Sequence, residues 1–116
     1  MAVLFGAMVL AGCSGNSAAT INVKVVKDGK PVVGEMVYMY RGSLQDSFLQ
    51  HKVHSSMQVA TDDSGVAEFK LSSGDFGFDS TLSFNFETFD SNENVNGKVA
   101  ASVNKGQSKD VTITQF

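Results

Sequence analysis

The residues with the clearest potential for chemistry are His51 and His54, the only two histidines among the 116 residues. Their His-x-x-His spacing places them on one side of a helix, or on opposite sides of a strand. Zinc sites generally use three or four Cys, His, Asp or Glu ligands, and the single cysteine, Cys13, lies far away near the start of the chain. The pattern therefore favours two solvated loop histidines over a metal centre.

A second candidate site is the run DSNEN, in which Asp90, Asn92 and Asn94 offer oxygen ligands at alternate positions. A calcium loop of the EF-hand type would continue with a Gly and end on a bidentate Glu, whereas this chain has Val95 and Ala101 at those positions. Residues of this kind also form turns. We therefore expect a hairpin turn, with Asp90, Asn92 and Asn94 as a weak calcium site only.

The remaining composition argues against catalysis and against nucleic acid. The chain shows no Gly-rich phosphate loop, no Ser-His-Asp order and no convincing pair of buried carboxylates. The formal net charge is −3 and the nine basic residues are scattered, whereas a nucleic-acid surface needs concentrated positive charge. We expect a protein that is not an enzyme, binds no nucleic acid and needs no cofactor.

Cys13 follows an uncharged apolar run, MAVLFGAMVLAG. The run is shorter than the roughly 20 residues that span a bilayer, and an apolar run ending in small residues is typical of a secretory signal. Leu10-Ala11-Gly12-Cys13 resembles the lipobox of bacterial lipoproteins, although no Lys or Arg precedes the run. The resemblance implies cleavage before Cys13, acyl chains on its thiol and amino group, and, because Ser14 follows, sorting to the outer membrane.

We therefore predict a signal peptide over residues 1–12, a short lipid-anchored tether over 13–19 and a single domain over 20–116. A domain of this length can bury a core of its own. One cysteine cannot form an internal disulfide. The covalent lipid on Cys13 is the only non-protein group that we expect, and the membrane is one predicted partner.

Seven strands are predicted in the domain. The first two, Thr20–Lys27 and Val33–Arg41, are joined by a turn at Asp28-Gly29-Lys30-Pro31, where the first two residues tolerate positive φ. A Gly-containing hairpin turn at Thr61–Gly65 is predicted to join the strands Met57–Ala60 and Val66–Leu71. The other predicted strands are Met57–Ala60, Val66–Leu71, Thr81–Asp90, Lys98–Lys105 and Asp110–Phe116. Short strands separated by regular turn signals predict an all-β, antiparallel, Ig-like or transthyretin-like sandwich.

Two segments between the strands are less regular. Ser72–Ser80 is predicted to be a loop whose Phe76 and Phe78 close one end of the core. In Thr81–Asp90, Leu82, Phe84 and Phe86 face the core and alternate with polar residues. Gly42–Ser55 is compatible with one helical turn followed by an extended stretch.

Three segments carry a family resemblance: GKPVVGEMVYM, ATDDSGVAEFKL and the closing DVTITQ. They resemble the carboxypeptidase regulatory-like domains, which share the transthyretin-type sandwich, and the likeness covers most of residues 20–116. The chain departs from this family at two places. Glu35 stands where these domains usually have a small residue, and the segment Gly42–Ser55 is longer than the corresponding segment of the family. The resemblance implies a non-catalytic accessory or adhesive module.

Two other functions stay open. Tyr40-Arg41-Gly42-Ser43 resembles the terminal tetrapeptide of the transthyretin-related hydrolases, but here it lies in the middle of the chain. Such a small hydrolase would need Arg41, His51 and His54 in one cleft. The other alternative is an adhesin or stalk module stiffened by calcium at Asp90, Asn92 and Asn94.

The predicted partner surface lies on the second strand, which is apolar on both faces. Val37 and Met39 line one face, whereas Met36, Tyr38 and Tyr40 line the other. A row of large groups away from the core needs cover or a partner. The neighbouring segment either covers this row, which the pattern slightly favours, or joins it in contacting a protein or glycan through Leu44, Phe48, Leu49 and Val53.

Overall fold

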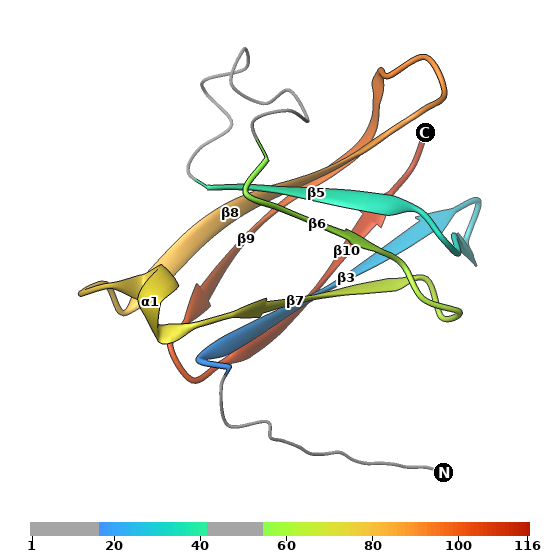
Figure 1. Ribbon diagram of the computed structural model, residues 1–116. Coiled ribbons are helices and arrows are strands. Elements are labelled where there is room, and N and C mark those ends of the chain that lie inside the picture. Colours follow the sequence, from blue (N-terminus) through green and yellow to red (C-terminus); the bar gives the residue numbers. More distant parts are fainter. Residues whose placement is uncertain (1–16, 42–54) are drawn as a thin grey trace, which may run out of the picture.

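The computed structural model describes residues 17–41 and 55–116, which form eight β-strands and one short helix (Figure 1). In chain order these are β3 (Ala19–Lys27), β4 (Lys30–Pro31), β5 (Met36–Arg41), β6 (Met57–Ala60), β7 (Val66–Leu71), α1 (Ser73–Phe76), β8 (Thr81–Phe89), β9 (Val95–Asn104) and β10 (Ser108–Thr114). The strands form two four-stranded sheets. In the first sheet β10, β4 and β7 all pair with β3, and in the second the order is β6-β5-β8-β9. The predicted all-β sandwich is confirmed, with eight strands in the described residues instead of seven.

The core lies between the two sheets and is built from the alternating positions that the sequence pattern indicated. Every second residue of β3 from Ile21 to Val25 is completely buried. Phe84 and Phe86 of β8 are 2% and 0% exposed. Phe69 of β7 packs on Phe86 from the opposite sheet, with ring centroids 5.1 Å apart. Each buried Phe contributes roughly 1.5–3 kcal/mol, so contacts between these rings stabilise the pairing of the two sheets.

The pairing of β3 with β10 is parallel, which corrects the prediction of a purely antiparallel sandwich. The register runs from Ser108 beside Thr20 to Thr114 beside Val26. Apolar alternation gives the same pattern for either strand direction, so the sequence could not reveal this. Since the first and last strands point the same way, the chain enters the sandwich at one end and leaves it at the other (Figure 1).

The predicted turn after β3 is confirmed, but its partner strand is not the one expected. Asp28 and Gly29 have φ angles of 53° and 78°, and this turn pairs β3 with the two-residue strand β4. The next strand, β5, belongs to the second sheet. The turn residues fix the local bend, whereas burial of both apolar faces decides where β5 packs.

The segment from Thr61 to Gly65 crosses between the sheets, so the predicted hairpin is wrong. β6 pairs with β5, whereas β7 pairs with β3. The local turn chemistry is nevertheless present, because Asp62 Oδ1 accepts the backbone N–H groups of Ser64 and Val66 at 2.8 and 3.1 Å. These short-range bonds determine the bend, but they do not determine which strand β7 pairs with after it.

The predicted loop over Ser72–Ser80 contains α1. Asp75 Oδ2 accepts the backbone N–H of Ser72 at 2.8 Å and its hydroxyl at 3.1 Å. Phe76 is 2% exposed and closes one end of the core as expected, but Phe78 is 109% exposed and does not. Gly77 has a φ of 57°, and this turn of the backbone directs the next side chain outward.

The opposite end of the sandwich is closed by a polar cluster. The Thr88 hydroxyl donates to Asn96 Oδ1 at 2.7 Å and accepts from Gln115 Nε2 at 3.1 Å. The Gln115 backbone N–H donates to the Val26 carbonyl of β3 at 2.8 Å, so the Gln115 side chain, held on the first sheet, reaches Thr88 of the second and joins the two sheets here. A Cβ at Gly97 would lie 2.9 Å from Thr88 Oγ1, so only glycine fits this close approach.

Candidate functional site

The predicted partner row lies on the outward surface of the second sheet. Val37 and Met39 of β5 are in the core, and Met36, Tyr38 and Tyr40 occupy the alternating positions. Their neighbours on β8 are polar: Tyr38 lies beside Glu87, and Tyr40 lies beside Asn85. We call Tyr38, Tyr40, Asn85 and Glu87 the tyrosine face. The other predicted contact residues, Leu44, Phe48, Leu49 and Val53, lie outside the described residues.

The centre of the tyrosine face is buried, which the sequence did not indicate for its polar members. Tyr40 and Asn85 are each 3% exposed and Glu87 is 4% exposed. Tyr38 is half-buried, and its ring meets that of Phe89 edge-on at 5.3 Å. Met36, at the start of β5, is 40% exposed. Within the predicted row, a partner can therefore reach the Met36 end directly, whereas the phenol and carboxyl groups are withdrawn from solvent.

Burial determines the protonation chemistry of this face. Burial raises the pKa of Glu87, and smaller effects of the Tyr40 hydroxyl and the Lys98 ammonium lower it. Burial, followed by the Glu87 charge, raises the pKa of Tyr40. Glu87 Oε1 and the Tyr40 hydroxyl have no hydrogen-bond partner within the described part of the chain. The pair therefore favours its uncharged forms.

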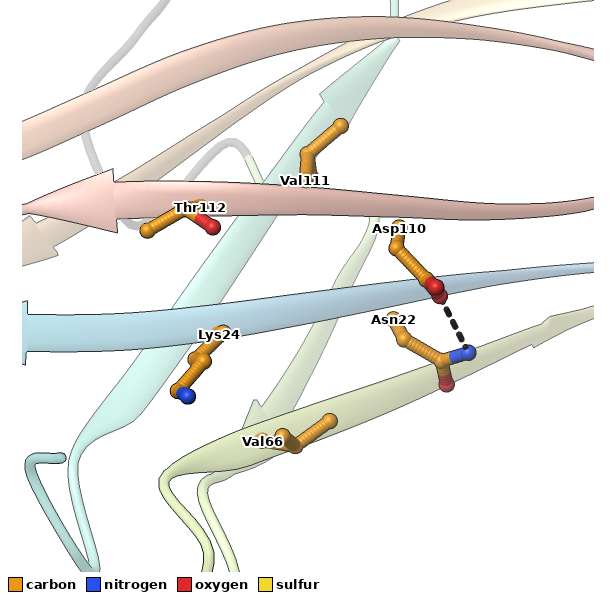
Figure 2. A pocket seen from close by; sticks show the side chains of 6 residues that line it. All are labelled: Asn22, Lys24, Val66, Asp110, Val111 and Thr112. Carbon is orange, nitrogen blue, oxygen red and sulfur yellow. Dashed lines mark hydrogen bonds between the residues drawn. The ribbon is translucent and has the colours of Figure 1, made fainter.

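A groove lies on the outward surface of the first sheet, where the sequence predicted no site (Figure 2). It has a volume of about 310 Å³. Asn22 Nδ2 donates to Asp110 Oδ1 at 3.0 Å across the β3–β10 pair. The groove is lined by Asn22, Lys24, Val66, Asp110, Val111 and Thr112. Outward polar residues on the first and last strands were visible in the sequence, but only their parallel pairing brings them together.

A smaller cavity of about 230 Å³ lies where β5 ends. Arg41 Nη2 donates to the backbone carbonyl of Asp75 at 3.1 Å, which ties β5 to α1. Met39, Met57, Leu71 and Phe84 also line it. Arg41 belongs to the tetrapeptide that suggested a hydrolase. Its proposed companions His51 and His54 lie outside the described residues, so this alternative stays a prediction.

The candidate calcium run forms the turn between β8 and β9. Asp90 Oδ1 accepts the backbone N–H groups of Asn92 and Asn94 at 2.8 and 3.0 Å, and Glu93 adopts a positive φ of 63°. Over residues 17–41 and 55–116, no three His, Cys, Asp or Glu side chains are close enough to hold a metal ion. The Asp90 carboxylate therefore has a defined role in shaping the turn.

Comparison with known proteins supports the fold. No protein-family model matches the chain, and no curated protein matches it in sequence. Among solved structures, the Bacillus anthracis TIE protein matches with a TM-score of 0.53 and 11% identity, over 92% of this chain. GBS52, the minor pilin of the Gram-positive pathogen Streptococcus agalactiae, matches with a TM-score of 0.49 and 15% identity, over 95% of this chain. The first likeness supports the β-sandwich.

This chain spans only part of those proteins, 17% of the TIE protein chain and 50% of the GBS52 chain. The resemblance to carboxypeptidase regulatory-like domains stays a prediction, as does lipidation, because Cys13 lies outside the described residues. None of the helices in the described segments is long and apolar enough to cross a membrane.

Proposed function

We propose that this protein is a non-catalytic binding or structural module of the bacterial envelope, anchored by lipid on Cys13. The observation that carries the proposal is the parallel pairing of β3 with β10. A strand advances about 3.3 Å per residue, so the seven paired positions of each strand separate the two ends by roughly 20 Å. A chain held by a tether before β3 therefore presents its far end away from the membrane.

The far end has the features of a contact surface. Val33, Met36 and Phe116 are 57%, 40% and 80% exposed. Backbone hydrogen bonds hold both parts of this surface. Between Val33 and Met36, the Gly34 N–H donates to the Thr61 carbonyl at 3.0 Å. The Phe116 N–H donates to the Asn96 carbonyl at 2.9 Å. We propose that a protein or glycan partner binds here and extends onto Tyr38 of the tyrosine face.

We also propose that the chain is related to the carboxypeptidase regulatory-like domains. Two of the sequence motifs that suggested this meet in the structure. Thr61, from the second motif, accepts Glu35 N–H at 2.9 Å and donates to the Val32 carbonyl at 2.6 Å in the first. A Cβ at Gly65 would lie 2.8 Å from Pro31 Cβ. These contacts support a shared design in which the two motifs form one junction.

The anchor is tested by expressing the full chain with its signal in a bacterium fed labelled palmitate. Wild type should incorporate label and sediment with the outer membrane, and Cys13→Ala should lose the label. Cys13→Ala retains every residue of both sheets, so its far-ultraviolet circular dichroism should be unchanged. Equal labelling of the two proteins would contradict the proposal.

A further inference from the structure

The loop after α1 presents an aromatic ring directly to solvent. Phe78 is 109% exposed, whereas Phe76, two residues earlier, is 2% exposed. A single exposed apolar side chain needs no special explanation by itself. The fixed geometry of this loop and its position relative to the start of the domain are what give Phe78 significance.

Backbone hydrogen bonds hold the chain on both sides of Phe78. Before it, the Gly77 N–H donates to the Ser73 carbonyl at 3.2 Å. After it, the Asp79 N–H donates to the Phe76 carbonyl at 2.9 Å, and the Ser80 carbonyl accepts the Lys105 N–H at 2.9 Å. Phe76 fixes the loop further by packing in the core. The Phe78 side chain is therefore held outward by a constrained backbone.

Phe78 lies at the end of the sandwich where the domain begins. Lys105, which binds the Ser80 carbonyl, precedes Gly106, whose N–H donates to the Ala18 carbonyl at 2.6 Å. Ala18 N–H donates to the Leu71 carbonyl at 2.7 Å, just before α1. Figure 1 shows α1 and the start of β3 at this same end. Cys13 precedes Ala18 by five residues, which span at most about 18 Å when extended.

We propose that Phe78 inserts into the surface of the membrane that carries the lipid on Cys13, and so orients the sandwich with its far end outward. This inference rests on the proposed lipid anchor. A short tether makes the contact intramolecular, and effective concentrations then reach the millimolar range. A weak contact, too small to recruit the protein, becomes sufficient to orient it. The exposed Lys105 side chain beside the loop is available to lipid phosphate groups.

A bilayer fits this feature better than a protein partner. A stable protein interface buries about 800 Å² on each side and usually contains a cluster of anchors. Here one ring projects from a loop whose flanking exposed residues, Gly77, Asp79 and Ser80, are small or polar. A fluid lipid surface can accommodate one side chain without shape complementarity, and the acyl chains supply the affinity.

The composition of the chain allows a direct test, because it has one cysteine and no tryptophan. Phe78→Trp gives a unique fluorophore at the proposed contact. Phe116→Trp is the matched control, since Phe116 is also exposed, at 80%, but lies at the far end. The mature chain, residues 13–116, contains every strand of both sheets. Its Cys13 is coupled to a maleimide phospholipid in phosphatidylcholine vesicles that contain brominated lipid.

We expect the Phe78→Trp emission to shift to shorter wavelength and to be quenched several-fold more by brominated lipid than that of Phe116→Trp. Equal, weak quenching of both would overturn the inference. Because the maleimide supplies the lipid chemically, this result does not depend on acylation in the cell. Absence of palmitate label from the wild-type protein would refute the natural anchor alone, and unquenched Phe78→Trp would refute the membrane contact alone.

Discussion

Tyr40 and Glu87 are diagonal neighbours across β5 and β8, and each buries a side-chain oxygen that no described residue hydrogen-bonds. Diagonal pairs on one face of a sheet lie within reach of long side chains. Leaving such groups unpaired is unfavourable. This part of the sheet therefore contains a pH-dependent weakness.

Stability should fall as the pH rises through the titration range of Glu87. Its pKa is raised in the folded protein, so the folded state holds the proton over a range in which the unfolded chain has lost it. The free energy of unfolding therefore decreases from about pH 4.5, the ordinary value, up to the folded pKa, and each pH unit of this range is worth about 1.4 kcal/mol. Glu87→Gln cannot ionise and should lack this decrease.

The measurement is urea unfolding of wild type and Glu87→Gln between pH 4 and 8. Glu68→Gln is the control, because Glu68 lies on an exposed position of β7. The difference between wild type and Glu87→Gln should grow with pH, in favour of the variant. A difference that is constant with pH would show that the Glu87 carboxyl is not held in its neutral form.

The two faces of β8 should contribute to stability by different means. Phe84→Ala removes a core ring and should cost roughly 3–5 kcal/mol. Asn85 faces away from the core, where the alternating pattern predicts a solvated residue whose truncation costs little, but it is only 3% exposed. We now expect Asn85→Ala to cost roughly 1–3 kcal/mol through a buried polar group. Thermal unfolding should rank Phe84→Ala, Asn85→Ala and the exposed-site control Ser83→Ala in that order; an Asn85→Ala value equal to the control would contradict the burial of this face.

Gly65 and Gly29 form a matched pair for testing the junction with Pro31. Both have a φ of 78°, so an Ala at either position carries the same backbone strain. A Cβ at Gly65 would also lie 2.8 Å from Pro31 Cβ, whereas at Gly29 nothing lies within 4 Å. Gly65→Ala should therefore unfold at lower urea concentration than Gly29→Ala, by about 1–3 kcal/mol for the crowding. Equal midpoints would mean that the junction relaxes without cost.

The Thr61 hydroxyl should contribute through its two backbone bonds. Thr61→Val preserves the shape but leaves the Glu35 N–H and Val32 carbonyl without this partner. We expect a loss of about 1–3 kcal/mol. Thr61→Ser retains the hydroxyl and should recover much of that loss. If chemical denaturation gives the same stability for the Val and Ser variants, the hydroxyl bonds are not important.

The sequence alone determined the β-sandwich class, most strand positions, the turn at Asp28-Gly29 and the inward side of β8. These properties follow from local chemistry, because alternation defines a buried face and positive φ selects particular turn residues. The same local information placed the bend at Thr61–Gly65 correctly. It also identified the apolar row of Met36, Tyr38 and Tyr40.

Only the tertiary structure decided how these elements combine. The parallel β3–β10 pair, the crossing between sheets after β6 and the burial of Glu87 depend on contacts between residues far apart in the chain. Phe76 and Phe78 show the limit most directly. The two aromatic residues occupy the same short segment, yet the turn at Gly77 buries one and exposes the other, because the packing of the ends of the sandwich determines which ring has a neighbour.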